Sequence, residues 1–127
     1  MDIDDFKGIN DTYGHSYGDR VIRCVGQTLL STFRSSDIVY RLGGDEFAVF
    51  MQAQKIDSVV ETKAEALMDN IANVAHTIGL EHPFTLSVGI ATTQTTDAIF
   101  ENLYNAADGE LYNVKRAGKG SFGIKRS

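Results

Sequence analysis

The chain has 127 residues, 43% of them hydrophobic and 23% charged, a balance that suits one globular domain with a single core. Its formal net charge of −5 argues against a nucleic-acid-binding platform, because such surfaces are basic. We predict no membrane span, because the sequence has no run of about 20 apolar residues. Cys24 is the single cysteine, which excludes an internal disulfide and indicates a reducing, cytoplasmic compartment.

The first half of the chain predicts a strand end, a loop, a helix and a pair of strands. Residues 1–6 have the pattern of a strand end, and residues 8–18 are rich in loop formers, with room for a short helical turn. Apolar residues then recur with a helical period, so Asp19 is expected at the helix N-terminus, where a carboxylate caps free N–H groups. Short β-branched or aromatic runs at 38–40 and 47–51 predict two strands.

A tight hairpin is predicted between those two strands. Gly43 and Gly44 are expected at the two central positions of its turn, because glycine accepts positive φ at both. Asp45 and Glu46 follow at once, and neighbouring strand residues point to opposite faces of a sheet. The two carboxylates are therefore not expected to share one role.

The second half of the chain alternates helices and strands. A 3.6-residue apolar period predicts an amphipathic helix over 60–78 that ends at Gly79. A strand at 84–91, a helix at 99–117 and a last strand at 121–124 follow. This order predicts an α/β sandwich, with helices packed against a largely antiparallel sheet.

Two motifs resemble the signatures of the GGDEF-domain family, the diguanylate cyclases. The chain opens with MDIDDFKGINDTYGH, with GD at positions 18–19, and the hairpin reads RLGGDEF at 41–47. The order and spacing match over essentially the whole chain. The resemblance implies a palm-like nucleotidyl cyclase fold and the condensation of two GTP molecules into cyclic di-GMP and pyrophosphate. A helix and most of the first strand precede this point in the family, so residues 1–127 are expected to form a single domain without those parts.

The acids of the two motifs suggest a metal site. Two carboxylates from separate segments repel each other unless a cation lies between them, and oxygen ligands suit a hard divalent cation. The resemblance implies that Asp2, Asp45 and the Ile3 carbonyl bind Mg²⁺ or Mn²⁺. It also implies that Asp45 is catalytic, and that Glu46 supports catalysis, a second metal position or the hairpin.

The same resemblance supplies groups for the triphosphate of GTP. Backbone N–H groups near Phe6 and Lys7 are expected to donate to it, as those at a helix start do elsewhere. Lys115 and Lys119 match the basic pair that meets the β- and γ-phosphates, although the family usually has arginine at the second position. Lysine keeps the charge but lacks the bidentate fork. Apart from the resemblance, the preferred interpretation is that these lysines interact favourably with the dipole at a helix C-terminus.

Two further pairs are assigned to guanine and to the product. Asn10 can donate and accept, and Asp19 can accept from the N–H groups of guanine, so this pair is expected to select GTP over ATP. Arg34 and Asp37 match the RxxD motif at which the family binds its own product as an inhibitor. The alternative for the second pair is an ordinary surface ion pair.

Three functions remain open at this stage. The first is an active cyclase, in which two copies face each other because the two-fold product needs two bound GTP molecules. The second is a catalytically silent GGDEF domain that binds GTP or cyclic di-GMP as a sensor. The third is another nucleotidyl cyclase on the same fold. In each case the chain is expected to be cytoplasmic, alone or as the cytoplasmic domain of a larger, membrane-anchored protein.

Overall fold

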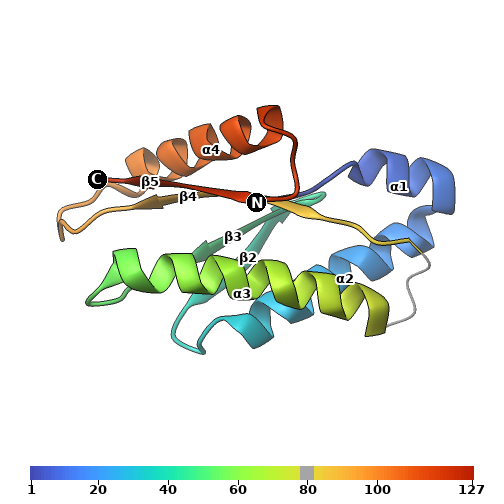
Figure 1. The fold of residues 1–127 in the computed structure, drawn as a ribbon, viewed down its shortest axis with the longest axis horizontal. Helices are drawn as coiled ribbons and strands as arrows, with labels where there is room; N and C mark the ends of the chain where they lie inside the picture. The colour runs from blue at the N-terminus through green and yellow to red at the C-terminus, as the bar shows by residue number, and fades with distance from the viewer. Residues whose placement is uncertain (78–81) are drawn as a thin grey trace.

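The computed structural model describes residues 1–77 and 82–127, which form a five-stranded sheet with helices on both faces (Figure 1). The strand order is β2-β3-β1-β4-β5, and every pairing is antiparallel except that between β4 and β5. The predicted α/β sandwich with a largely antiparallel sheet is therefore confirmed. In chain order the elements are β1 (Asp2–Ile3), α1 (Phe6–Tyr13), α2 (His15–Thr32), β2 (Ile38–Gly43), β3 (Glu46–Phe50), α3 (Ile56–Thr77), β4 (Leu86–Thr92), α4 (Phe100–Arg116) and β5 (Phe122–Arg126).

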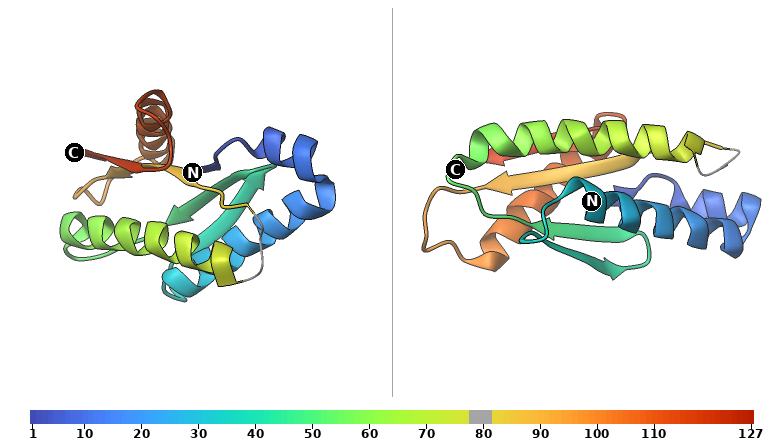
Figure 2. Two further views of the ribbon diagram at one scale, coloured as in Figure 1. Left: turned by 45° about the vertical axis from the view of Figure 1, so that its right-hand side comes forward. Right: turned by 90° about the horizontal axis from the view of Figure 1, so that it is seen from below.

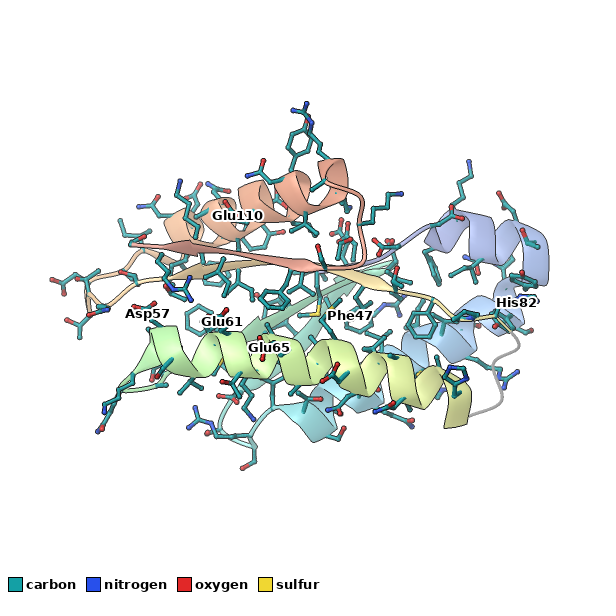
Figure 3. The ribbon with its side chains drawn as sticks, in the orientation of Figure 1. Phe47, Asp57, Glu61, Glu65, His82 and Glu110 are labelled. Carbon is teal, nitrogen blue, oxygen red and sulfur yellow. The ribbon has the colours of Figure 1, made fainter. Side chains whose placement is uncertain are left out.

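The helices divide between the two faces of the sheet. Helices α2 and α3 pack side by side on one face, and α4 lies on the other face over β4 and β5 (Figures 1 and 2). Phe47 of β3 is 4% exposed and points from the sheet toward α3 (Figure 3). The apolar side chains that fill this layer and are at most 2% exposed are Ile3, Val21, Cys24, Val25, Leu29, Leu67, Ile71 and Leu86.

The central strand of the sheet is also its shortest. Asp2 pairs with Glu46 of β3 and with Ser87 of β4, and the Met1 carbonyl accepts the Phe47 amide at 2.9 Å. This pairing brings the carboxyl end of β1 close to the hairpin and to β4. Residues of β3 and β4 also line a cavity of about 1210 Å³, together with residues of α3 and α4.

The segment at 8–18 is more helical than predicted. It belongs to α1 and to the start of α2, with Gly14 between the two helices at φ +90°. Phe6 and Ile9 pack against the core, and the Tyr13 ring stacks on His82 at 4.2 Å, so tertiary contacts favour helix despite the loop-forming composition. His82 lies at the end of the molecule where α1 and α2 meet (Figure 3).

Two local predictions were wrong. Asp19 is not an N-cap, because α2 begins at His15 and places Asp19 a full turn inside the helix. The central hairpin residues are Gly44 and Asp45, because Gly43 still pairs with Glu46 after an irregularity in the register. Both glycines do have positive φ, at +147° and +52°.

The second half of the chain follows its predicted order. The helix expected over 60–78 corresponds to α3, while its predicted last apolar position, Ile78, and its predicted end, Gly79, lie outside the described residues. The strand at 84–91, the helix at 99–117 and the strand at 121–124 correspond to β4, α4 and β5. Within the described ranges no helix has the length and apolar character needed to cross a membrane.

Candidate functional site

A small cavity lies where β1 ends, at the hairpin turn and the C-terminal end of α4. Its volume is about 240 Å³. Three segments far apart in the sequence therefore share one pocket, and most of the residues expected to bind phosphate and metal are among them. The lining residues are Ile3, Asp4, Asp5, Phe6, Lys7, Asp45, Lys115 and Lys119.

The sheet register positions the acids of the candidate metal site. The Ile3 amide donates to the Asp45 carbonyl at 3.2 Å, which holds the hairpin turn beside the end of β1. Asp2 is 9% exposed and lies opposite Glu46. Asp45 lines the small cavity, whereas Asp2 and Glu46 line the larger one. The two hairpin acids therefore line different cavities, Asp45 from the turn and Glu46 from the first position of β3.

Lys115 lines the small cavity and pairs with an acid that lines the larger one. Its ammonium group forms an ion pair with the Asp2 carboxylate. Burial acts to lower the pKa of Lys115, but the hydrogen bond and charge of Asp2, with the charges of Asp45 and Asp4, raise it overall. Lys115 is therefore charged at neutral pH and offsets the acids around it.

The donor set fits a divalent cation bound partly by other oxygens. Asp2 and Asp45 carry carboxylate oxygens, the hard ligands that such a cation prefers, and Asp2 pairs here with the Lys115 ammonium group. The described part of the chain contains no group of three or more His, Cys, Asp or Glu side chains that could hold a metal. A bound cation would therefore need the Ile3 carbonyl and oxygens from the substrate.

The start of α1 supplies N–H donors to the small cavity. The first N–H groups of a helix have no partner within it, and here they belong to residues that line the pocket, Phe6 and Lys7. Asp5 precedes them at φ +50°, and Lys119, which lines the same cavity, has φ +64°. Positive φ is unfavourable for residues with a Cβ, so the fold holds both in position.

Asn10 has a buried acceptor without a partner. Among the side chains that the structure describes, its Oδ1 is the one buried polar atom with no hydrogen bond. It lies against Gly18, where a Cβ would be 1.8 Å from this oxygen. Asp19 follows on the exposed surface of α2, so the α1–α2 contact brings the predicted guanine-binding pair together.

The Arg34–Asp37 pair lies between α2 and β2 and is not among the residues that line the small cavity. The Arg34 guanidinium contacts the Asp37 carboxylate at 3.1 Å and donates to the Gln52 carbonyl at 2.7 Å. Burial acts to raise the pKa of Asp37, but the side-chain and backbone hydrogen bonds of Arg34 lower it overall. In this conformation the pair forms a local ion pair.

This pKa shift predicts a pH-dependent stability. Because the pKa of Asp37 in the folded chain lies below its ordinary value of 3.8, ionised Asp37 stabilises the fold above that pH, and the contribution disappears as the pH falls through the lower folded value. Asp37→Asn should therefore lower the free energy of unfolding at neutral pH, with a smaller effect in acid. Urea unfolding across this range measures the difference. Asp97→Asn, which removes the same charge from an exposed loop, is the control, and an equal pH dependence in both variants would contradict the assignment.

Two residues of this site were given no role in the sequence-based prediction, although both belong to the first motif. Gly18 gives Asn10 its space, whereas the sequence placed it in the loop-rich segment at 8–18. The Asp4 carboxylate accepts hydrogen bonds from Thr85, Ser87 and Gly120. These partners lie far along the chain, so the sequence contained no local signal for them.

Comparison with known proteins identifies one family. The family model described as "Diguanylate cyclase, GGDEF domain" matches residues 1–121. The diguanylate cyclase DgcM of Escherichia coli K12 is 38% identical over 119 residues, which cover 94% of this chain and 28% of DgcM. The chain thus spans less than a third of the length of that relative.

Solved structures share the fold. A Pseudomonas aeruginosa structure comprising only the GGDEF domain of TpbB (or YfiN) has a TM-score of 0.85 and 30% identity, over 97% of this chain and 72% of that one. The GGDEF domain of DgcB from Caulobacter crescentus, in complex with c-di-GMP, has a TM-score of 0.78 and 32% identity, over 97% and 73% of the two chains.

Proposed function

Because the chain belongs to the GGDEF-domain family, we propose that it is a diguanylate cyclase domain, which condenses two GTP molecules into cyclic di-GMP and releases pyrophosphate. The observation that carries this proposal is the small cavity, where the hairpin acid Asp45 meets the start of α1 and the two lysines at 115 and 119. The c-di-GMP complex of the similar DgcB domain supports the choice of product.

The proposed metal ligands are Asp2, Asp45 and the Ile3 carbonyl, with Glu46 at a second position. When bound, Mg²⁺ or Mn²⁺ would lower the pKa of the attacking 3′-hydroxyl and offset charge on the phosphates. Glu46 lines the larger cavity together with Asp2, whereas Asp45 lines the smaller one.

The basic residues and the helix start bind the triphosphate in this proposal. The N–H groups of Phe6 and Lys7 donate to phosphate oxygens, and the helix dipole favours negative charge at the same point. Lys115 exchanges its Asp2 partner for a phosphate oxygen when GTP enters. Lys119, an exposed residue that lines the same cavity, contacts the β- or γ-phosphate.

Asn10 and Asp19 read the guanine base. The unpartnered Oδ1 of Asn10 accepts an N–H of the base and so satisfies a buried polar atom. Asp19 accepts from the ring N–H and the amino group, which adenine does not present in the same pattern. The pair therefore favours GTP over ATP.

The product requires a second copy of the domain. In each of two steps, the 3′-hydroxyl of one GTP attacks the α-phosphorus of the other, and pyrophosphate leaves. One domain binds one GTP, so two copies in an antiparallel arrangement complete the reaction. The rate is then second order in the domain unless another segment holds two copies together.

The silent sensor and the other nucleotidyl cyclase remain the competing functions. The intact motif at 43–47, with Asp2 and Lys115, favours activity. Incubating the protein with GTP and Mg²⁺, followed by mass analysis, separates the three. Cyclic di-GMP supports the proposal, bound but unreacted GTP indicates the sensor, and a cyclic mononucleotide indicates the third function.

Product inhibition provides an independent prediction. The Arg34 guanidinium, which pairs with Asp37 and donates to the Gln52 carbonyl, would turn from these partners to fork onto a phosphate or a guanine edge of cyclic di-GMP. Arg34→Ala should weaken cyclic di-GMP binding at least about tenfold, the loss of one charge-assisted contact, while the initial rate is kept. Calorimetry and progress curves measure the two effects. Arg23→Ala, at an exposed position on α2, is the matched control, and unchanged affinity in Arg34→Ala would remove the pair from the inhibitory site.

A further inference from the structure

Asp4 is an acid of the first motif without a role among the proposed ligands. Its carboxylate accepts hydrogen bonds from the Thr85 and Ser87 hydroxyls, each at 2.6 Å, and from the Gly120 amide at 3.0 Å. The Gly120 amide also approaches the Ser87 hydroxyl at 3.2 Å. One carboxylate thus links the end of β1 to β4 and to the turn that follows α4.

That turn carries Lys119. Gly118, Lys119 and Gly120 all have positive φ, at +125°, +64° and +63°. The Lys119 amide donates to the Val114 carbonyl at 3.1 Å, which holds the turn to α4 on one side. The Asp4 carboxylate holds it on the other side, at the residue directly after Lys119. A residue with a Cβ persists at positive φ only where its surroundings fix it, and these two attachments do so.

Asp4 and Lys119 also line the same small cavity, together with Lys7 and Lys115. A free carboxylate there would repel a triphosphate. The Asp4 oxygens are directed at protein donors instead, Oδ1 at Ser87 and Oδ2 at Thr85 and Gly120. This arrangement differs from that of a metal ligand, whose oxygens face the ion.

We infer that Asp4 is a positioning residue whose carboxylate holds the turn at residues 118–120 against β1, and so directs Lys119 toward the β- and γ-phosphates of GTP. The inference rests on the proposed function. It predicts that Asp4 acts on triphosphate affinity, through Lys119, and leaves recognition of the base unchanged.

Two substitutions separate the hydrogen bonds from the charge. Asp4→Ala and Asp4→Asn both remove the negative charge, which by itself would tighten the binding of an anion. Only asparagine keeps an acceptor oxygen for Gly120, while its amino group can donate to the Ser87 hydroxyl. Asp4→Ala should therefore weaken triphosphate binding relative to the parent, whereas Asp4→Asn should keep most of the parent's affinity. Asp11→Asn, at an exposed position on α1, measures the effect of charge alone.

The probes are 3′-deoxy-GTP, which lacks the attacking hydroxyl, and GMP, each titrated with Mg²⁺ by calorimetry. We expect Asp4→Ala to lose about tenfold in affinity for 3′-deoxy-GTP and less than about twofold for GMP. Unchanged affinity for 3′-deoxy-GTP, or equal losses for both ligands, would overturn the inference. If the parent chain bound neither probe, the proposed function itself would fail, a result distinct from either of these.

A double-mutant cycle tests the route through Lys119. Lys119→Ala keeps a Cβ, so it removes the ammonium group without changing the backbone preference. If Asp4 acts through this lysine, Asp4→Ala should weaken 3′-deoxy-GTP binding no further once Lys119 is alanine. Additive losses would overturn the inference.

Ser87→Ala is the alternative variant if Asp4→Ala does not fold. It removes one donor to the Asp4 carboxylate and one contact of the Gly120 amide. It should lower the affinity for 3′-deoxy-GTP several-fold and keep the affinity for GMP, and an unchanged affinity for 3′-deoxy-GTP would overturn the inference.

Discussion

Asp45→Ala is expected to reduce cyclic di-GMP formation by roughly a thousandfold or more, which corresponds to about 4 kcal/mol of lost transition-state stabilisation. Asp45 is the carboxylate that the hairpin places in the small cavity beside Lys115 and the start of α1. Its backbone carbonyl, which the substitution keeps, receives the Ile3 amide. Turnover of GTP by the purified variant, with the product identified by mass, measures the effect.

The fold should survive this substitution. Asp5 and Lys119 are the non-glycine residues with positive φ in the described ranges, so alanine is compatible with the backbone at Asp45. The melting temperature of Asp45→Ala should therefore stay near that of the parent, while Mn²⁺ binding, followed by electron paramagnetic resonance, should weaken. Asp97→Ala removes an equal charge from an exposed loop and should change neither measurement. Substantial cyclase activity in Asp45→Ala would exclude Asp45 from the mechanism.

Strong periodicity made most of the fold predictable. The apolar period of α3 and α4 and the β-branched runs of the hairpin each favour one secondary structure, and their order favours one sheet arrangement. The segment at 8–18 was misjudged because Gly8, Asn10 and Gly14 favour loops in isolation. The packing of Phe6 and Ile9 on the core, which only the assembled fold shows, outweighs that preference.

The candidate site was predictable only as a set of residue types. The two motifs indicated which acids and lysines to expect, and the structure places Asp45, Lys115 and Lys119 around one cavity. The sequence did not show that Lys115 pairs with Asp2 in the free protein, because the two residues are separated by almost the whole chain. It also did not show the hydrogen bonds of Asp4, whose partners come from β4 and from the turn before β5.

The position of Lys115 also depends on how closely α4 approaches the sheet. Gly89 of β4 lies directly under this helix, and a Cβ there would be 2.1 Å from the Ala107 carbonyl oxygen and 2.3 Å from the Leu111 amide nitrogen. Both are backbone atoms, so no change of side-chain rotamer relieves the clash. The whole helix would have to move away from the sheet, which would expose Leu111 and Val114, now 8% and 6% exposed.

Gly89→Ala is therefore expected to lower the free energy of unfolding by about 3 kcal/mol or more, measured by urea denaturation. Gly123→Ala should cost less, because its Cβ would meet the ends of the Glu110 and Val114 side chains, at 2.9 and 3.1 Å, and these can shift. Gly109→Ala, within α4 and with nothing within 4 Å of the added Cβ, should stabilise the chain by about 0.5–1 kcal/mol through helix propensity. From the most to the least stable variant, the predicted order is thus Gly109→Ala, Gly123→Ala and Gly89→Ala. If Gly89→Ala proved as stable as the parent, α4 could not lie as close to β4 as the structure places it, and the pairing of Lys115 with Asp2 would lose its support.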